Sequence, residues 1–495
     1  MKFNHRYFFF IFASLLASNI YSQTVSGKVL TASQEAIPYA TVQIGESYGV
    51  ITNEEGLFSI KTNDFDDNEM VRISCLGYES VDLKLINFKS QDYTLKEKVN
   101  ELSEVFITNK PLSVDSIMFY VNAKLKENYR FHLNEFKIFS RKTEYIVGEN
   151  ADFEITKSTG FRKKQLELFN TDFDKLETSL LNNNSKQYTD FIGSLMILDD
   201  SQAKLKVEKA IRLLDERNNQ SLESLAEKGN DIVLKHLDKD KIYTVKTGLF
   251  KISDSVSLDN REDKMADTIN SLGHIRTKSF EMIMNNALNN SNNRLDFISE
   301  TKKYNYELKD VTFIDDEMVY IIDFKPKRSS VKYTGTIYVS NETFAVIRAD
   351  YRFYKNRVGE KLNLRLLFGV KYVEKNQEGI VAFKKDDDGY YYPSFINEQI
   401  DRYFYINRPF KFIENSNTSN KVSFSFKIEG TFKEKTELLI LSRNEIETST
   451  FNSYKELKDV DYETPKTYDA SIWSDYNVIE PLNEMKDFKI PVEEY

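Results

Sequence analysis

The stretch Thr52-Asn53-Glu54-Glu55-Gly56-Leu57-Phe58-Ser59-Ile60 joins a tight turn to a short strand. Asn53 is a common turn residue, and Gly56 can adopt the positive φ that many tight turns need. After the glycine, Phe58 and Ile60 alternate with polar neighbours. A period of two predicts a strand with one buried face and one face in water.

More short strands are expected on both sides of this turn, and many short strands with close turn signals are typical of a β-sandwich. Gly77 is expected to end one strand so that Tyr78 can cover the sandwich edge. Cys75 is expected to be an inert buried side chain and not a nucleophile. The candidate strands lie at residues 24–30, 39–45, 56–62, 69–75, 79–86 and 103–108.

Several short motifs follow one another in this part of the chain: Gly27-Lys28-Val29, Pro38-Tyr39-Ala40-Thr41-Val42, Gly49, Thr52 to Ile60, and Ile73-Ser74-Cys75-Leu76-Gly77-Tyr78. Their order resembles the carboxypeptidase-regulatory-like domain, which has a transthyretin-like fold. The resemblance covers about 85 residues and implies a non-catalytic β-sandwich over residues 23–109. Such domains are common at the start of exported proteins of Bacteroidota-type bacteria. Cys75 departs from the family, which more often has an aromatic or aliphatic residue there.

Residues 1–22 have the features of a secretory signal peptide. Lys2 and Arg6 provide the positive charge, and residues 7–17 form an apolar stretch that is too short to cross a bilayer as a helix. Cleavage is expected after Ser22. We therefore expect export to the periplasm, the outer membrane or another part of the cell envelope.

Composition narrows the class of partner. The chain has 68 basic and 77 acidic residues, and loss of Lys2 and Arg6 leaves 66 against 77, a net charge of −11. An acidic chain without a basic cluster is a poor candidate for binding nucleic acid or anionic membrane surfaces. Association with the outer membrane by other means stays open. The single cysteine excludes an internal disulfide, and no later apolar run is long enough to predict a spanning helix.

The hydrophobic period changes from about residue 110. Ser113 is a good N-cap for a helical stripe of Val114, Ile117, Val121 and Leu125. Residues 110–300 are therefore interpreted as a helix-rich α+β region. Within it we expect a strand over 135–147, a helix over 200–227, a helix near 279–289 that starts at Ser279, and an Asn-rich loop over 285–293.

Residues 301–445 return to alternation, and about eight consecutive strands, one of them over 361–370, predict an antiparallel meander. The segments 333–339 and 344–347 look similar to a LolA-like half-barrel. Residues 446–495 form a C-terminal tail whose IWSDYN motif, with Trp473, also resembles the ends of such proteins. The predicted fold class is mainly β with helices (α+β): an N-terminal transthyretin-like sandwich, a helical segment and an antiparallel β-meander, or half-barrel.

The sharpest enzymatic pattern is His132-Leu133-Asn134-Glu135, because metallocarboxypeptidases use an H-x-x-E spacing for two zinc ligands. His236 or His274 could supply the third ligand that zinc requires. A single such pair among many glutamates arises easily by chance, and no matching arginine motif for a substrate carboxylate accompanies it. We interpret these residues as structural.

Two acidic clusters are better explained as turns than as metal sites. Asp64, Asp66 and Asn68 begin like an EF-hand loop, but the sixth position is Glu69 and the twelfth is Cys75. Asp386-Asp387-Asp388-Gly389 lies between two candidate strands, where a turn is expected. We therefore predict no catalytic, metal-binding or cofactor-binding residues and no cofactor.

An aromatic group could line a ligand groove or could simply be sheet and core residues, and the sequence leaves both interpretations open. The group consists of Tyr390, Tyr391, Tyr392, Tyr403, Phe404 and Tyr405.

The predicted function is that of an exported, non-catalytic envelope protein. The sandwich would be an interaction module, and the larger sheet would be a scaffold or a surface for an apolar ligand. The expected partner is an envelope protein or an apolar ligand, and not a nucleic acid. Three alternatives stay open: a lipid or lipoprotein carrier, a small outer-membrane barrel, and a zinc metallopeptidase.

Overall fold

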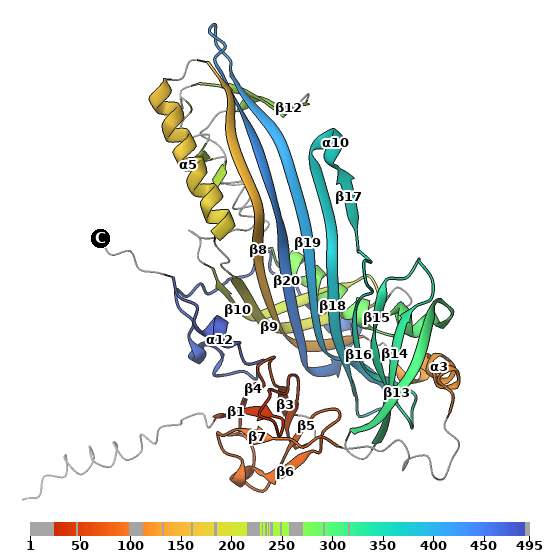
Figure 1. Ribbon diagram of the computed structural model, residues 1–495. Coiled ribbons are helices and arrows are strands. Elements are labelled where there is room, and N and C mark those ends of the chain that lie inside the picture. Colours follow the sequence, from red (N-terminus) through yellow and green to blue (C-terminus); the bar gives the residue numbers. More distant parts are fainter. Residues whose placement is uncertain are drawn as a thin grey trace, which may run out of the picture. The chain divides into compact units, whose positions relative to one another are not determined.

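The computed structural model describes residues 24–490 with several gaps (Figure 1). The expected signal peptide and the expected strand at 103–108 lie outside the described residues. Two compact units form: residues 24–98 with 469–483, and residues 112–468 with 484–490. The gaps are 46–47, 99–111, 131–132, 160–161, 183–185, 215–227, 230, 233–234, 236, 238–240, 248–249, 257–270, 291–292 and 315–316, and only the backbone is described for 250–256.

The first unit contains the expected β-sandwich. One sheet has the order β4-β1-β7 and the other β3-β2-β5-β6. Phe58, Ile60, Val42 and Ile73 come from both sheets and are buried in one core, as the period of two predicted. The strands are β1 Thr24–Leu30, β2 Thr41–Ile44, β3 Tyr48–Ile51, β4 Leu57–Lys61, β5 Met70–Ser74, β6 Val81–Lys84 and β7 Tyr93–Thr94, with the short helix η1 at Leu85–Asn87.

Both expected turns of the sandwich are confirmed. Gly56 has φ +77°, and its N–H donates to the Asn53 carbonyl at 3.0 Å. Gly77 has φ +88° and lies in the turn after β5, where Tyr78 packs against the core. Cys75 lies just beyond β5 and is half-buried, so it is less enclosed than predicted.

The second unit is built on one antiparallel sheet of thirteen strands among the described residues, ordered β10-β9-β8-β20-β19-β18-β16-β15-β14-β13. The hairpin β11–β12 pairs with β19, and β17 pairs with β18. The eight strands from β13 to β20 confirm the expected meander. The strands are β8 Asn134–Ser158, β9 Gln187–Ile197, β10 Ala203–Leu213, β11 Tyr243–Thr247, β12 Phe250–Val256, β13 Tyr304–Ile314, β14 Glu317–Pro326, β15 Tyr333–Ser340, β16 Val346–Phe353, β17 Lys361–Leu364, β18 Val370–Lys385, β19 Tyr391–Glu414 and β20 Lys421–Glu445.

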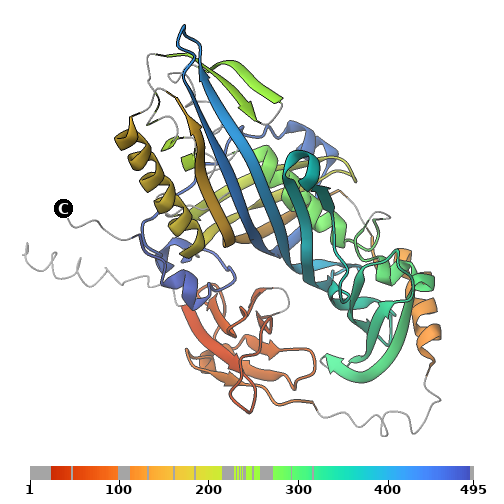
Figure 2. The same ribbon diagram turned by 45° about the horizontal axis from the view of Figure 1, so that its top comes forward.

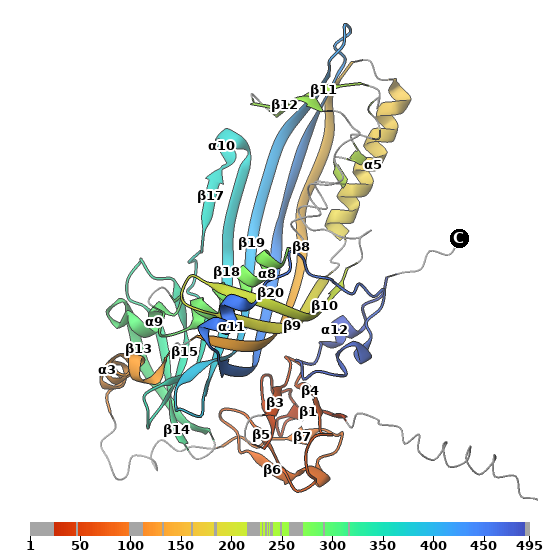
Figure 3. The same ribbon diagram turned by 180° about the vertical axis from the view of Figure 1, so that it is seen from behind.

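Helices pack against this sheet, with α5 along the far part of β8 and α8 across β9, β10 and β19 (Figures 1 and 3). The expected N-cap of α3 is confirmed, because the Ser113 side chain accepts a hydrogen bond from the Ser116 N–H. The helices are α3 Val114–Ala123, α4 Leu125–Asn128, α5 Lys163–Asn182, α8 Leu272–Asn286, α9 Asp296–Ser299, η3 Thr301–Lys303, α10 Arg365–Phe368, α11 Thr448–Ser453, η4 Ala470–Trp473 and α12 Asn483–Lys486.

Three expectations for these elements were wrong. The helix predicted over 200–227 is the strand β10 in its described part, and a register shift between Val207 and Lys209 interrupts the strict alternation there. The helix expected to start at Ser279 starts seven residues earlier and includes the first two asparagines assigned to a loop, Asn285 and Asn286. The strand expected over 361–370 is broken by α10, which ends at Gly369 with φ +63°.

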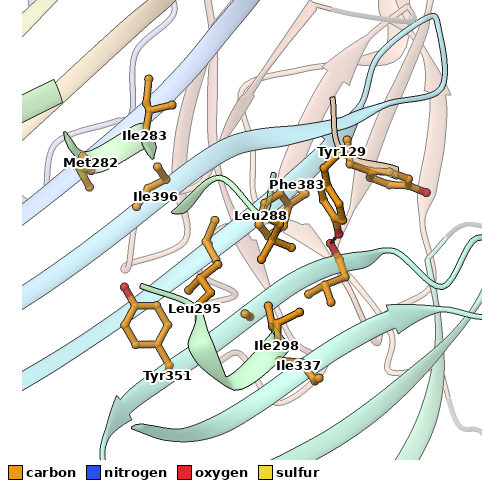
Figure 4. Packing of buried hydrophobic residues seen from close by; sticks show 14 of the residues in the cluster. Tyr129, Met282, Ile283, Leu288, Leu295, Ile298, Ile337, Tyr351, Phe383 and Ile396 are labelled. Carbon is orange, nitrogen blue, oxygen red and sulfur yellow. Dashed lines mark hydrogen bonds between the residues drawn. The ribbon is translucent and has the colours of Figure 1, made fainter. Parts of the chain in front are cut away.

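One face of the sheet, here called the inner face, carries Ile396 and its cross-strand partner Leu438, which are both fully buried. Helices α3, α8 and α9 fill the lower part of the inner face, and Figure 4 shows Met282, Ile283 and Ile298 packed there. A second core lies farther along the same strands, where α5 covers the sheet. Figure 2 shows the long strands that connect the two cores.

Candidate functional site

The sandwich turn binds a segment from the other end of the chain. The Asn53 side-chain N–H groups donate to the carbonyls of Glu480 at 3.0 Å and Pro481 at 3.1 Å. The same side chain uses its oxygen to accept the N–H groups of Glu55 at 2.9 Å and Leu57 at 3.0 Å. Asn53 is 1% exposed, so each of these bonds replaces water that the buried amide has lost. One residue therefore shapes the turn and holds the distant segment.

Further contacts extend this docking site over residues 474–483. The backbone N–H of Lys61 donates to the Asn477 side-chain oxygen at 3.4 Å, and the N–H of Asn483 donates to the Glu55 carboxylate at 3.0 Å. Ile479 is fully buried. The Lys61–Asp475 ion pair at 3.6 Å is exposed and adds little. The site thus recognises main-chain carbonyls and one asparagine, which is the chemistry of peptide binding.

A second feature is a polar belt on the inner face of the large sheet, between its two cores. It consists of Lys142, Glu144, Glu374, Glu398, Arg402 and Glu434. Along β19 the inner-facing side chains change from apolar Ile396 to charged Glu398 and Arg402. They then become apolar again at Phe404, which belongs to the second core. β8 and β20 make the same change at the same height, because Lys142, Thr436 and Glu398 are direct cross-strand neighbours.

The belt is held together by ion pairs. Glu144 and Glu434 lie directly opposite each other, which is unfavourable for two like charges without counterions. Lys142 pairs with Glu144 at 2.9 Å, and Arg402 pairs with Glu434 at 3.3 Å. Burial alone would lower the pKa of Lys142 and of Arg402, but the neighbouring glutamates raise both above their ordinary values. The cations are therefore charged at any physiological pH and neutralise the opposed carboxylates.

Polar side chains continue from the belt into the first core. Arg294 and the Gln377 amide both bind the Glu398 carboxylate. The Tyr333 hydroxyl donates to the Gln377 side-chain oxygen at 2.7 Å, and burial raises the pKa of this tyrosine. The arrangement of these groups is that of a structural network.

The opposite face of the sheet carries a deeply buried ion pair. Arg141 and Asp190 are cross-strand neighbours on β8 and β9, and their closest atoms, Nη2 and Oδ2, are 2.7 Å apart. The two residues are 3% and 1% exposed. Burial would lower the pKa of Arg141, but the Asp190 charge raises it, so the guanidinium stays protonated.

The residues of the zinc pattern are not brought together in the described structure. His132 and His236 lie outside the described residues. Glu135 is on β8 and His274 on α8. In the parts of the chain that are described, no three His, Cys, Asp or Glu side chains form a group that could hold a metal ion.

Both acidic clusters are found in turns. The Asp66 carboxylate accepts the Asn68 N–H at 2.9 Å. Asp386 begins the turn between β18 and β19, where its carboxylate accepts the Tyr390 N–H at 2.7 Å and also pairs with Arg443. The hydrogen bond between Asp66 and Asn68 lies in an exposed loop. The contacts of Asp386 hold the turn of the β18–β19 hairpin.

The aromatic group does not line one groove. Tyr391 belongs to the first core and Phe404 to the second. Tyr403 and Tyr405 alternate with Phe404 on β19 and point to the opposite face, where Lys375 lies 4.0 Å from the Tyr403 ring. The alternation of the strand therefore divides the group between two faces.

Sequence reasoning missed both the docking site and the belt. IWSDYN stood out as a motif, but nothing near it in the sequence indicates that its binding surface lies more than 400 residues away. The belt could have been suspected from charged residues at inner-facing positions, such as Glu398 and Arg402 within an aromatic-rich strand. That signal needs the strand register, which a sequence alone does not supply.

Comparison with known proteins agrees with the first unit. Residues 25–107 match the family model of the CarboxypepD_reg-like domain, a non-catalytic domain type. No curated protein matches the chain. Within the described part, no helix is both long and apolar enough to cross a bilayer. A solved structure from Bacteroides fragilis, a protein of unknown function that is proposed to be membrane-associated, aligns over 84% of this chain and 97% of its own, at 7% identity and a TM-score of 0.13.

Proposed function

We propose that this protein is an exported, non-catalytic envelope protein whose sandwich is a peptide-docking module and whose large sheet is a scaffold. The observation that carries the proposal is the contact between Asn53 and the carbonyls of Glu480 and Pro481. Because two of the contacts are to main-chain atoms, a different extended segment could make them equally well. The docked segment of this chain then stands where a segment of a partner protein would bind.

The scaffold role is supported by how the inner face is filled. Side chains from α3, α8 and α9 occupy the lower part of this face, and α5 covers the upper part. A carrier of lipid or lipoprotein needs an apolar surface that its cargo can reach. A face filled by the protein's own helices favours a scaffold over such a carrier.

Peptide binding to the complete mature chain tests the docking role. The double substitution Asn477→Ala and Ile479→Asp weakens the chain's own segment but leaves its binding surface intact. A fluorescent peptide with the sequence of residues 474–483 should bind this variant, as measured by fluorescence anisotropy. Adding Asn53→Asp should abolish binding, because the carboxylate keeps the turn but cannot donate to the two carbonyls.

A matched control is Asn63→Asp, which adds the same charge at an exposed position of the same unit. It should leave peptide binding unchanged. Equal binding with and without Asn53→Asp, or no binding to the weakened chain at all, would contradict the docking role. Turnover that depends on a single side chain, or stoichiometric zinc binding in a titration, would contradict the non-catalytic assignment.

A further inference from the structure

The hairpin formed by β17 and β18 ends in leucines that face water. Leu362, Leu366 and Leu367 are 48%, 101% and 78% exposed. They lie within six residues of one another, on or next to the short helix α10 (Figure 1). Single exposed apolar residues are ordinary, but a group of large ones at one tip marks a surface that meets something apolar.

The tip is fixed to the sheet and is not a loose loop. The Asn407 N–H donates to the Gly369 carbonyl at 2.7 Å, and the Arg408 guanidinium donates to the Phe368 carbonyl at 2.9 Å. Gly369 has φ +63°, and a Cβ there would lie 1.9 Å from the Asn407 carbonyl oxygen. The chain therefore holds the two most exposed leucines in a defined, outward position.

Basic residues surround the leucines. Lys361, Arg365 and Lys371 belong to the hairpin, and Arg408 lies on the adjoining strand. Residues 361–373 and 402–413 contain no Asp or Glu. Arg365 lies 4.1 Å from the Tyr405 ring, so its charge stays beside the apolar tip. The acidic balance of the whole chain hides this local positive surface.

We propose that this tip inserts into the headgroup region of a bilayer that contains anionic lipids. Leu366 and Leu367 would enter the apolar boundary, while the cations at the base of the tip contact phosphate groups. Long basic side chains suit this position because their stems can lie along apolar surface while the charge stays in water. A small apolar tip with cations around its foot suits a lipid surface as its partner. A protein partner usually needs a broader contact area.

This proposal does not depend on the peptide-docking role of the sandwich, because all its residues belong to the second unit. The Asn53→Asp chain should still bind vesicles. Failure of one proposal therefore leaves the other intact.

Vesicle flotation of the complete mature chain tests the proposal. The chain should float with vesicles of phosphatidylcholine and phosphatidylglycerol and much less with phosphatidylcholine alone. The double substitution Leu366→Ser and Leu367→Ser should lower vesicle affinity roughly tenfold, because it removes the apolar groups that enter the bilayer. Lys361→Gln with Lys371→Gln should lower binding to the anionic vesicles and weaken its dependence on salt.

The matched control is Leu457→Ser, which removes a leucine of similar exposure, 73%, elsewhere in the same unit. It should bind vesicles as the unchanged chain does. Thermal unfolding should be the same for the leucine variants, since the substituted leucines are exposed. A photo-crosslinking residue at position 367 should give lipid adducts.

Three results would overturn the proposal. The unchanged chain could fail to float with either vesicle composition. The double serine variant could float as well as the unchanged chain. The crosslinker at position 367 could label a protein and no lipid when membranes are present, which would assign the tip to a protein partner instead.

Discussion

The sandwich and the large sheet bury their apolar side chains in opposite ways. The sandwich has strands of two to seven residues and takes residues 469–483 from the far end of the chain into its unit. The large sheet has strands of up to 25 residues, which extend through more than one hydrophobic core. A small domain buries too little of its own surface, so it gains from a borrowed segment. Along the long strands of the large sheet, the polar belt separates the two cores.

The largest expected losses of stability come from removing one aromatic ring from the core of either unit. Phe297→Ala should destabilise the large sheet by about 3–5 kcal/mol, because Phe297 is fully buried and stacks on Phe324 with ring centroids 4.1 Å apart. Phe58→Ala should cost the sandwich a similar amount. Denaturant unfolding followed by circular dichroism and by tryptophan fluorescence distinguishes the units.

The only tryptophan, Trp473, is 5% exposed and belongs to the sandwich unit. Its fluorescence transition should move with Phe58→Ala and stay in place with Phe297→Ala. If both substitutions move it equally, the two units unfold together and the comparison fails.

Next in size is the buried ion pair of the large sheet. Arg141→Met should cost about 3 kcal/mol, because it leaves the Asp190 carboxylate buried without its partner. Adding Asp190→Leu should recover most of the loss, since a buried ion pair often contributes little more than an apolar pair does. Urea unfolding of the single and double variants measures the coupling. A double variant as unstable as Arg141→Met would show that the pair itself is needed.

A smaller effect is expected at the turn that binds the distant segment. Gly56→Ala should destabilise the sandwich by about 2 kcal/mol, because φ is +77° and the added Cβ would lie 2.6 Å from the Val29 carbonyl oxygen. Gly389→Ala in the large sheet also has a positive φ, but its nearest neighbour would be 3.9 Å away, so about 1 kcal/mol is expected. Equal losses in thermal unfolding would show that crowding at Gly56 is unimportant.

The smallest effect concerns acid. Asp469 caps the helix that carries Trp473, and hydrogen bonds from Ser471 hold the pKa of Asp469 below its ordinary value of 3.8. A lowered pKa in the folded state means that the stabilising contribution is present above pH 3.8 and is lost as the pH falls further. Trp473 emission should therefore shift to longer wavelength below this pH.

Asp469→Asn provides the comparison for the acid effect, because it removes the titrating group at this position. The shift at low pH should be smaller in this variant. An identical shift would assign the change to other carboxylates of the unit.

Local pattern was enough to predict the sandwich and much of the meander. The strand expected at 24–30 is β1, and Ser113 caps α3 as expected, since both depend on neighbours a few positions away. β10 was missed because its apolar residues lie among many charged ones, and the register shift between Val207 and Lys209 interrupts the alternation that indicates a strand. The docking of Glu480 on Asn53 depends on residues 427 positions apart, and no local pattern contains that information.

The same separation has a consequence for the order in which the protein is made. The sandwich strands are synthesised first, while the carbonyls that Asn53 holds are added 427 and 428 residues after Asn53. Until then, the early domain presents an open binding surface to whatever accompanies the growing chain. Closing that surface requires Glu480 and Pro481, so a chain cut short before Asp469 would keep the binding surface open.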